Sequence, residues 1–303
     1  MKLLNKLIIT IIPFLPKSFV RLVASPYIAG ITNDEMIDSV LKLNNQGYDV
    51  AIDILGEHVK TEIEAERITN HYKEIYQLIN QNNLSANISI KLTHIGQDLG
   101  YDVVKKNLFE LLKAAKETNN FLRIDMENSP YTSETIQLYK ECIKIYDKVG
   151  IVLQAYMLRS ENDLEILSDK NFNVRICKGI YVEDESIVFK NFYRIRENYI
   201  SLVKKGLLNN SYIAIATHDE EIINHLSSWI IENKIPNSQF EFQSLHGVPI
   251  EKKLQELLSQ NFKVRIYLPF GDNWYDYSIR RLKENPKMAG YILKNLFKKI
   301  FRI

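Results

Sequence analysis

Short runs rich in β-branched and aromatic residues recur along the chain, and segments with helical periodicity separate them. Eight such runs are predicted strands, at 48–56, 87–92, 121–128, 150–157, 172–179, 211–219, 239–247 and 263–271. Strands that alternate with helices favour a parallel sheet, and eight such units in about 250 residues favour a closed barrel over an open sheet. The sequence therefore predicts an α/β fold, a (β/α)8 barrel of the TIM type.

The predicted barrel, 47–286, is flanked by an N-terminal helical arm at 1–46 and a basic amphipathic tail at 287–303. Near the start, an apolar run at 7–15 resembles a signal peptide, but it is too short to span a bilayer and prolines interrupt it. A capping arm or a membrane-surface segment fits it better. The tail carries only positive charges, so it either lies on an anionic membrane surface or docks on the barrel.

The charge balance and the missing motifs exclude several classes of protein. The chain has 39 basic and 37 acidic side chains, and no basic block interleaved with aromatics, so nucleic acid is not an expected partner. No G-x-G pair or G-x-x-x-x-G-K motif occurs, which argues against a Rossmann site or a P-loop, and no H-E-x-x-H or C-x-x-C motif indicates zinc. Two cysteines, Cys142 and Cys177, favour a reducing compartment and hence a cytoplasmic protein.

Polar side chains occur near the ends of nearly all the predicted strands. They are Asp53, Glu57, Lys91, Asp125, Glu127, Gln154, Arg175, Lys178, Tyr181, Thr217, His218, Asp219, Glu241, Gln243, His246, Arg265 and Tyr267. Active sites of such barrels lie at the carboxyl ends of the strands, so we expect these side chains to face one rim. More cations gather here than one carboxylate needs, namely Lys91, Arg175 and Lys178 with Arg280 and Arg281 of the next segment. This indicates two anionic groups, such as a cofactor phosphate and a substrate carboxylate.

A predicted helix follows the last strand in "YLPFGDNWYDYSIRRLKEN". Tyr277, Arg280, Arg281 and Glu284 have the i, i+3, i+4, i+7 spacing that puts side chains on one helical face. Asp272 and Asn273 stand where a helix N-cap is expected. This face is either a carboxylate clamp or a solvated helix surface.

The chain resembles the proline dehydrogenase family over almost its whole length. The motifs that carry the resemblance are "SIKLTHIG", "RIDMENSPYT", "LQAYMLRS", "RICKGIYVE", "ATHD", "FEFQSLHG" and "YLPFGDNWYDYSIRRLKEN". The resemblance implies a distorted (β/α)8 barrel that uses FAD to oxidise L-proline to 1-pyrroline-5-carboxylate and passes electrons to a membrane quinone. The length is similar to that of single-function bacterial members, which implies a separate 1-pyrroline-5-carboxylate dehydrogenase and peripheral contact with the inner face of the membrane.

The resemblance also implies roles around the substrate. Asp125 matches an active-site aspartate that would orient Lys91, and Arg175 matches an arginine at the N5 edge of the flavin. The residues matching the proline site are Lys91, Arg280 and Arg281 on the carboxylate, Tyr267 and Tyr277 against the ring, Tyr181 as a wall and Glu57 as a gate. An aromatic at Tyr277 favours proline over hydroxyproline.

Other positions match the flavin site, and no metal ligand is implied. With Arg175, they are Met126, Gln154, Lys178, Gly179, Ile180, Thr217 and His218. The chain departs from the family pattern at Cys177, where an aliphatic residue is usual, at Ile180, where a small residue is common, and at Asp219, where asparagine is usual.

Three other functions are compatible with the residues alone. A Schiff-base aldolase would use Lys91 or Lys178 as its nucleophile. A metal-dependent enzyme would use Asp125, Glu127 and His218 as ligands. A binding or regulatory protein would keep the fold without turnover.

Overall fold

The computed structural model describes residues 27–168, 172–275 and 277–279. The predicted clamp residues Arg280, Arg281 and Glu284 lie outside the described residues. The basic tail and most of the predicted N-terminal arm lie outside them as well.

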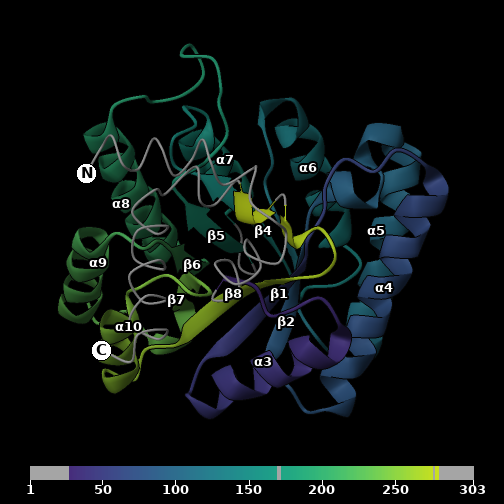
Figure 1. Cartoon of the computed structure of the whole chain (residues 1–303). Coiled ribbons are helices and arrows are strands. Elements are labelled where there is room, and N and C mark those ends of the chain that lie inside the picture. The colour runs from purple at the N-terminus through teal and green to yellow at the C-terminus, as the bar shows by residue number, and fades with distance from the viewer. Residues whose placement is uncertain (1–26, 169–171, 276, 280–303) are drawn as a thin grey trace, which may run out of the picture.

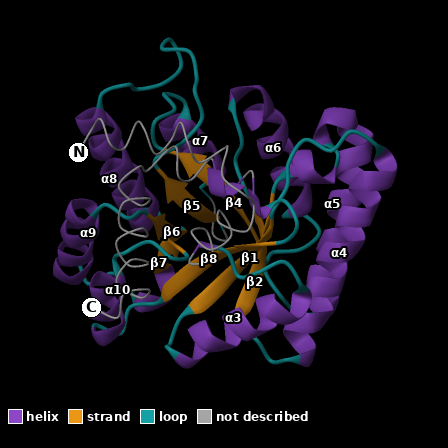
Figure 2. Cartoon of the chain, in the orientation of Figure 1, coloured by secondary structure: helices purple, strands orange, loops and turns teal. Residues whose placement is uncertain are grey.

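Eight parallel strands close into a barrel in which each strand pairs with the next and β8 pairs with β1 (Figures 1 and 2). The strands are β1 (Asp49–Ile54), β2 (Ala86–Ile90), β3 (Leu122–Ile124), β4 (Val149–Gln154), β5 (Asn173–Cys177), β6 (Tyr212–Ala216), β7 (Phe240–Leu245) and β8 (Val264–Phe270). Each predicted strand overlaps its observed counterpart, so the predicted (β/α)8 fold is confirmed.

Helices surround the strands in both views (Figures 1 and 2). They are α3 (Asn33–Asn45), α4 (Glu62–Gln81), α5 (Tyr101–Glu117), α6 (Ser129–Cys142), α7 (Ser160–Leu167), α8 (Phe192–Leu208), α9 (Glu220–Glu232) and α10 (Glu251–Ser259), with short 3-10 helices η3 (Leu92–Ile95), η4 (Gln97–Leu99) and η5 (Asn237–Gln239). Helix α3, within the predicted arm, packs against β1 and starts with a capping box formed by Thr32 and Glu35. No helix among the described residues is long and apolar enough to cross a membrane.

The strands carry aliphatic side chains on the face that packs against the helices. In β1, Ile52 and Ile54 belong to the same buried cluster as Val40 of α3 and Ile75 of α4. The alternate positions of the strands point into the barrel, because successive side chains of a strand lie on opposite faces. Many of these inward positions are polar, so hydrogen bonds and ion pairs fill much of the barrel interior, where aliphatic layers are the common solution.

The amino-terminal half of the barrel holds part of this polar interior. Arg265 Nε donates to Glu241 Oε1 at 2.9 Å, and Arg265 Nη2 lies 3.3 Å from Asp49 Oδ2. Asp49, Glu241 and Arg265 are the first or second residues of their strands. The expectation that Glu241 and Arg265 lie at the carboxyl rim is therefore wrong, because their side chains satisfy one another near the opposite end of the barrel.

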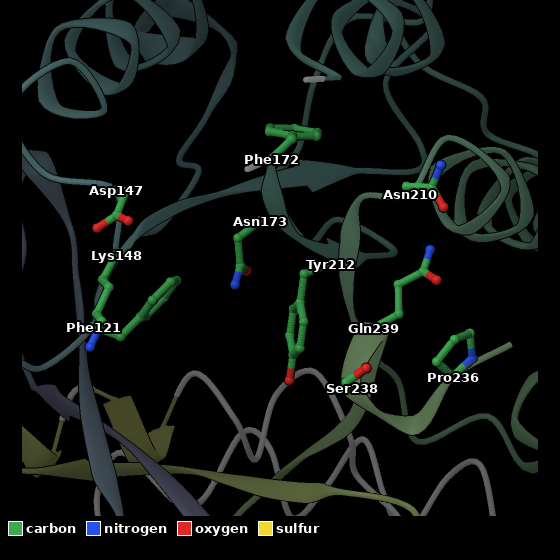
Figure 3. Close-up of a pocket in the computed structure, with 10 residues that line it drawn as sticks. All are labelled: Phe121, Asp147, Lys148, Phe172, Asn173, Asn210, Tyr212, Pro236, Ser238 and Gln239. Carbon is green, nitrogen blue, oxygen red and sulfur yellow. The ribbon is translucent and has the colours of Figure 1, made fainter. Parts of the chain in front are cut away.

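A cavity of about 370 Å³ opens at this amino-terminal end (Figure 3). Its lining includes Phe121 before β3, Lys148 before β4, Asn173 of β5 and Tyr212 of β6. The Tyr212 hydroxyl donates to Glu241 Oε2 at 3.0 Å. The cavity therefore borders the structural ion pairs of the barrel and lies away from the carboxyl ends of the strands.

The ion pair of Glu241 predicts a measurable, pH-dependent contribution to stability. Burial alone would raise the pKa of Glu241, but the charges of Arg265 and Lys263 outweigh it and lower this pKa to about 2. Glu241→Ala leaves Arg265 buried without this partner and should lower the free energy of unfolding at pH 7 by about 3–5 kcal/mol.

Chemical denaturation at several pH values checks this prediction. The difference from wild type should shrink as pH falls from about 4.3, the ordinary glutamate pKa, toward about 2, because Glu241 then binds a proton in the unfolded chain before it does so in the folded one. The matched control is Glu256→Ala, which breaks an exposed pair with Lys253 and should cost less than about 1 kcal/mol. Equal losses in the two variants would contradict the assigned role of Glu241.

Candidate active site

A buried ion pair between Asp125 and Arg175 lies at the centre of the predicted site. Arg175 Nη1 lies 2.6 Å from Asp125 Oδ1, and the side chains are only 7% and 13% exposed. The same carboxylate accepts from Ser89 Oγ at 2.6 Å and from the Tyr267 hydroxyl at 2.8 Å. Side chains from β2, β5 and β8 thus converge on the one carboxylate that follows β3.

The Arg175 guanidinium is fixed on several sides. Nε donates to Gln243 Oε1 at 2.6 Å, and Nη1 donates to Ser89 Oγ at 3.1 Å as well as to Asp125. The guanidinium carbon lies 5.1 Å from the centre of the Tyr267 ring, within the range of a cation–π contact. The predicted site residues Asp125, Arg175 and Tyr267 are therefore in direct contact.

A second ion pair joins Lys91, which follows β2, to Asp53 of β1. Lys91 Nζ lies 3.0 Å from Asp53 Oδ2, with the side chains 15% and 2% exposed. Burial alone would lower the pKa of Lys91, but the carboxylates of Asp53 and Asp125 outweigh it and raise this pKa above its ordinary value. The prediction that Asp125 orients Lys91 needs correction: Asp53 binds the ammonium group directly, and Asp125 acts on it through its charge.

Hydrogen bonds link the segment after β3 to the segment after β2 and to the end of β4. The Glu127 carboxylate accepts from Thr93 N at 3.1 Å and from Thr93 Oγ1 at 2.6 Å. Gln154 Nε2 donates to the Glu127 carbonyl oxygen at 2.9 Å, which fixes the direction of this amide. The side chain of Met126 packs in the main hydrophobic core.

The loop after β5 begins with Lys178-Gly179-Ile180. Gly179 has a φ of +101°, and a Cβ there would lie 2.1 Å from the Tyr156 ring, so both the backbone and the packing require glycine. The next side chain, Ile180, is 57% exposed. This exposure gives the isoleucine side chain room.

The turn after β6 carries Thr217, His218 and Asp219. Leu245 N donates to His218 Nε2 at 2.9 Å, so the ring proton of neutral His218 is on Nδ1. Asp219 binds Lys178 Nζ at 2.6 Å and Arg196 Nε at 2.6 Å. Asp219 therefore holds Lys178, a lysine predicted to bind flavin.

Tyr181 and Glu57 lie near the charges of this centre, and Tyr277 lies in the segment after β8. Burial raises the pKa of the Tyr181 hydroxyl, and the charges of Glu127 and Glu57 add to the rise. Tyr277 is buried in the helical segment that follows β8, where its amide nitrogen lies 3.4 Å from the Asn273 carbonyl oxygen. That segment becomes helical at Trp274, as the predicted N-cap indicates.

The geometry gives little support to the aldolase and metal-enzyme alternatives. A Schiff-base lysine needs an amine with a lowered pKa, whereas the pKa of Lys91 is raised and Lys178 is paired with Asp219. The proposed metal ligands bind separate protein donors: Asp125 binds Arg175, Glu127 binds Thr93 and His218 binds Leu245. No cluster of three or more metal-ligating side chains occurs within the described parts of the chain.

Comparison with known proteins decides the family. A family model described as Proline dehydrogenase matches residues 36–292. The chain belongs to the proline dehydrogenase family. Proline dehydrogenase 1 of Bacillus subtilis strain 168 is 36% identical over 279 residues, which cover 92% of either chain. Proline dehydrogenase of Deinococcus radiodurans is 30% identical over 281 residues, which cover 91% of this chain and 90% of that protein.

Proline dehydrogenase relatives of known structure share the fold. The crystal structure of proline utilization A from Bdellovibrio bacteriovorus matches with a TM-score of 0.80 and 25% identity. The match covers 87% of this chain and 33% of that longer one. Membership of the proline dehydrogenase family makes this chain an enzyme that oxidises proline.

Some residues of this centre were not predicted as site residues. Asp53 and Gln243 are polar residues near strand ends to which the sequence assigns no role, and Ser89 is not among the predicted site residues. Asp53 and Ser89 each stand between two buried isoleucines in β1 and β2, and Gln243 follows the buried Phe242 in β7, so the alternation of the strands indicates inward-facing side chains. Their partners could not be predicted, because each comes from a different strand.

Gly179 is required by its backbone conformation and by its packing against Tyr156, and a comparison with Gly100 separates these two effects. Gly100 also has a positive φ, +126°, but a Cβ there would meet nothing within 4 Å. Gly100→Ala should therefore cost only the backbone strain, about 1–3 kcal/mol of unfolding free energy. Gly179→Ala should cost more, because Tyr156 must also move.

Unfolding free energies of both variants, measured with and without added FAD, check this prediction. Gly179→Ala should also weaken FAD binding if the turn after β5 borders the cofactor, while Gly100→Ala should leave it unchanged. A smaller loss of stability for Gly179→Ala than for Gly100→Ala would contradict the packing assigned to Tyr156.

Proposed function

We propose that this enzyme uses FAD to oxidise L-proline to 1-pyrroline-5-carboxylate, and that the electrons pass to a membrane quinone. The observation that carries the proposal is a set of two buried cations inside the barrel, Arg175 and Lys91, each paired with its own carboxylate. Two separately fixed cations suit two anionic partners, one on the cofactor and one on the substrate.

The proposed role of Lys91 is to bind the proline carboxylate. Its raised pKa keeps it protonated throughout the physiological range, so it offers a permanent positive charge. Asp53 binds the ammonium group and fixes its position, and 15% of the Lys91 side chain is exposed. Arg280 and Arg281 are the proposed second half of the clamp, since they follow β8, the strand that pairs with β1 and carries Tyr267.

The residues around the ion pairs fit FAD without a Rossmann motif. Gln154 presents an amide of fixed direction, and Gly179 allows the backbone a conformation that other residues rarely adopt. The proposed groups near the phosphates are Lys178, Thr217 and His218. Met126 and Ile180 are also proposed to line the flavin site. When bound, FAD supplies the electron acceptor for the oxidation of proline.

The proposed role of Arg175 is to stabilise negative charge that develops beside it, because a fixed cation in a buried site acts strongly on nearby charge. Asp125 already accepts hydrogen bonds from Arg175, Ser89 and Tyr267. Its proposed role is therefore orientation, with Tyr267 held near the proline ring. Tyr181, Tyr277 and Glu57 are the proposed wall and gate of the pocket.

The proposed partners follow from the electron acceptor. A quinone dissolved in the membrane requires peripheral contact at its inner face, and the basic tail is the proposed contact segment. A separate 1-pyrroline-5-carboxylate dehydrogenase is the proposed consumer of the product.

The visible spectrum of the purified protein under anaerobic conditions tests the proposal. The FAD-loaded protein should be yellow, and L-proline should bleach it, while glycine, which has the carboxylate and amine but no ring, should not. A colourless protein that FAD cannot reconstitute would contradict the cofactor. A yellow protein that L-proline does not bleach would favour a binding protein without turnover.

A further inference from the structure

A column of charge-complementary hydrogen bonds runs through the barrel from Arg175 toward the amino ends of the strands. Arg175 Nε donates to Gln243 Oε1 at 2.6 Å, and Gln243 Nε2 donates to Glu241 Oε1 at 2.6 Å. Arg265 Nε donates to the same Glu241 oxygen at 2.9 Å. Gln243 and Glu241 are only 4% and 2% exposed, so no water competes freely for these bonds.

Charges on both sides force the direction of the Gln243 amide. A guanidinium group can only donate hydrogen bonds, and an ionised carboxylate can only accept them. Arg265 and Lys263 keep Glu241 ionised, so the amide oxygen must face Arg175 and the amide nitrogen must face Glu241. The reversed amide would place donor against donor and acceptor against acceptor inside the barrel.

This amide completes the fixation of Arg175. The guanidinium group is planar, so an attachment at Nε and another at Nη1 together set the plane and the direction of Nη2. Asp125 and Ser89 hold Nη1, and Gln243 alone holds Nε. Without Gln243 the guanidinium could rotate about its contact with Asp125.

We infer that Gln243 is a positioning residue for Arg175, and that Glu241 acts through Gln243 by setting the direction of its amide. Neither Gln nor Arg relays protons readily. The column therefore fixes the orientation of the Arg175 guanidinium and does not carry protons. The inference rests on the proposed function, because that function places Arg175 beside the reacting groups.

Gln243→Leu tests the positioning role. It keeps a side chain of comparable bulk but removes both hydrogen bonds. The rate of flavin reduction by proline should fall about 10- to 100-fold, while the KM for proline should change less than about threefold, because the Lys91–Asp53 pair is untouched. The reduction potential of bound flavin should become more negative. The matched control is Gln255→Leu on helix α10, which loses a hydrogen bond to the Tyr48 hydroxyl and should behave as wild type.

Gln243→Glu provides a second test if the leucine variant does not fold. The introduced carboxyl group, when protonated, can still accept from Arg175 and donate to Glu241, so this variant should match wild type at low pH. The charged groups that contact this side chain are Arg175 and Glu241. Asp125 and Tyr267 contact Arg175 in turn, and Tyr212, Lys263 and Arg265 contact Glu241. As pH rises and the introduced group ionises next to Glu241, the flavin potential and the reduction rate should fall relative to wild type.

The outcomes separate the two claims. If L-proline bleaches the wild type and the Gln243→Glu defect grows with pH, the inference holds. If L-proline bleaches the wild type and both Gln243 variants match it at every pH, or change KM alone, the inference fails and the proposed function stands. If L-proline does not bleach the wild type, the proposed function fails and takes the inference with it.

Discussion

The buried ion pair between Arg175 and Asp125 is the interaction on which the rest of the site depends. Removing two charges from water costs several kcal/mol for each ion unless geometry and further hydrogen bonds compensate. Here the compensation comes from Ser89, Tyr267 and Gln243, so β2, β5, β7 and β8 each contribute a side chain to the pair. The pair therefore constrains the register of half the barrel, and the barrel in turn holds the pair rigid.

This constraint explains how the interior of the barrel is filled. Aliphatic side chains face outward to the helices, where they form the main core, and polar side chains face inward in linked pairs. Lys91–Asp53 near the carboxyl ends and Arg265–Glu241 near the amino ends both bury opposite charges together. An enzyme that must hold two anionic partners needs fixed cations, and a polar interior supplies their counter-charges without water.

The fold could be predicted from the sequence because it depends on local patterns. Eight aliphatic runs that alternate with amphipathic segments are sufficient for a (β/α)8 barrel, and the structure confirms all eight strands. Inward-facing residues could be read from the same alternation, and Asp125, Arg175 and Tyr267 do converge. The pairing of the charged residues could not be predicted. Lys91 binds Asp53 and not Asp125 because of distances between strands that only the closed barrel fixes. Glu241 and Arg265 lie at the opposite end of the barrel from the predicted one. The alternation pattern gives the face of a strand on which a side chain lies, but not its position along a short strand.

A crystal structure of the protein with FAD and a non-reactive carboxylate analogue of proline would test the central claim most directly. The account predicts the flavin ring at the carboxyl ends of the strands beside the Arg175 guanidinium, and the analogue carboxylate in contact with Lys91 Nζ. Arg175 should remain bonded to Asp125 and Gln243. Flavin bound at the amino-terminal cavity near Tyr212, or an analogue carboxylate that does not contact Lys91, would contradict it.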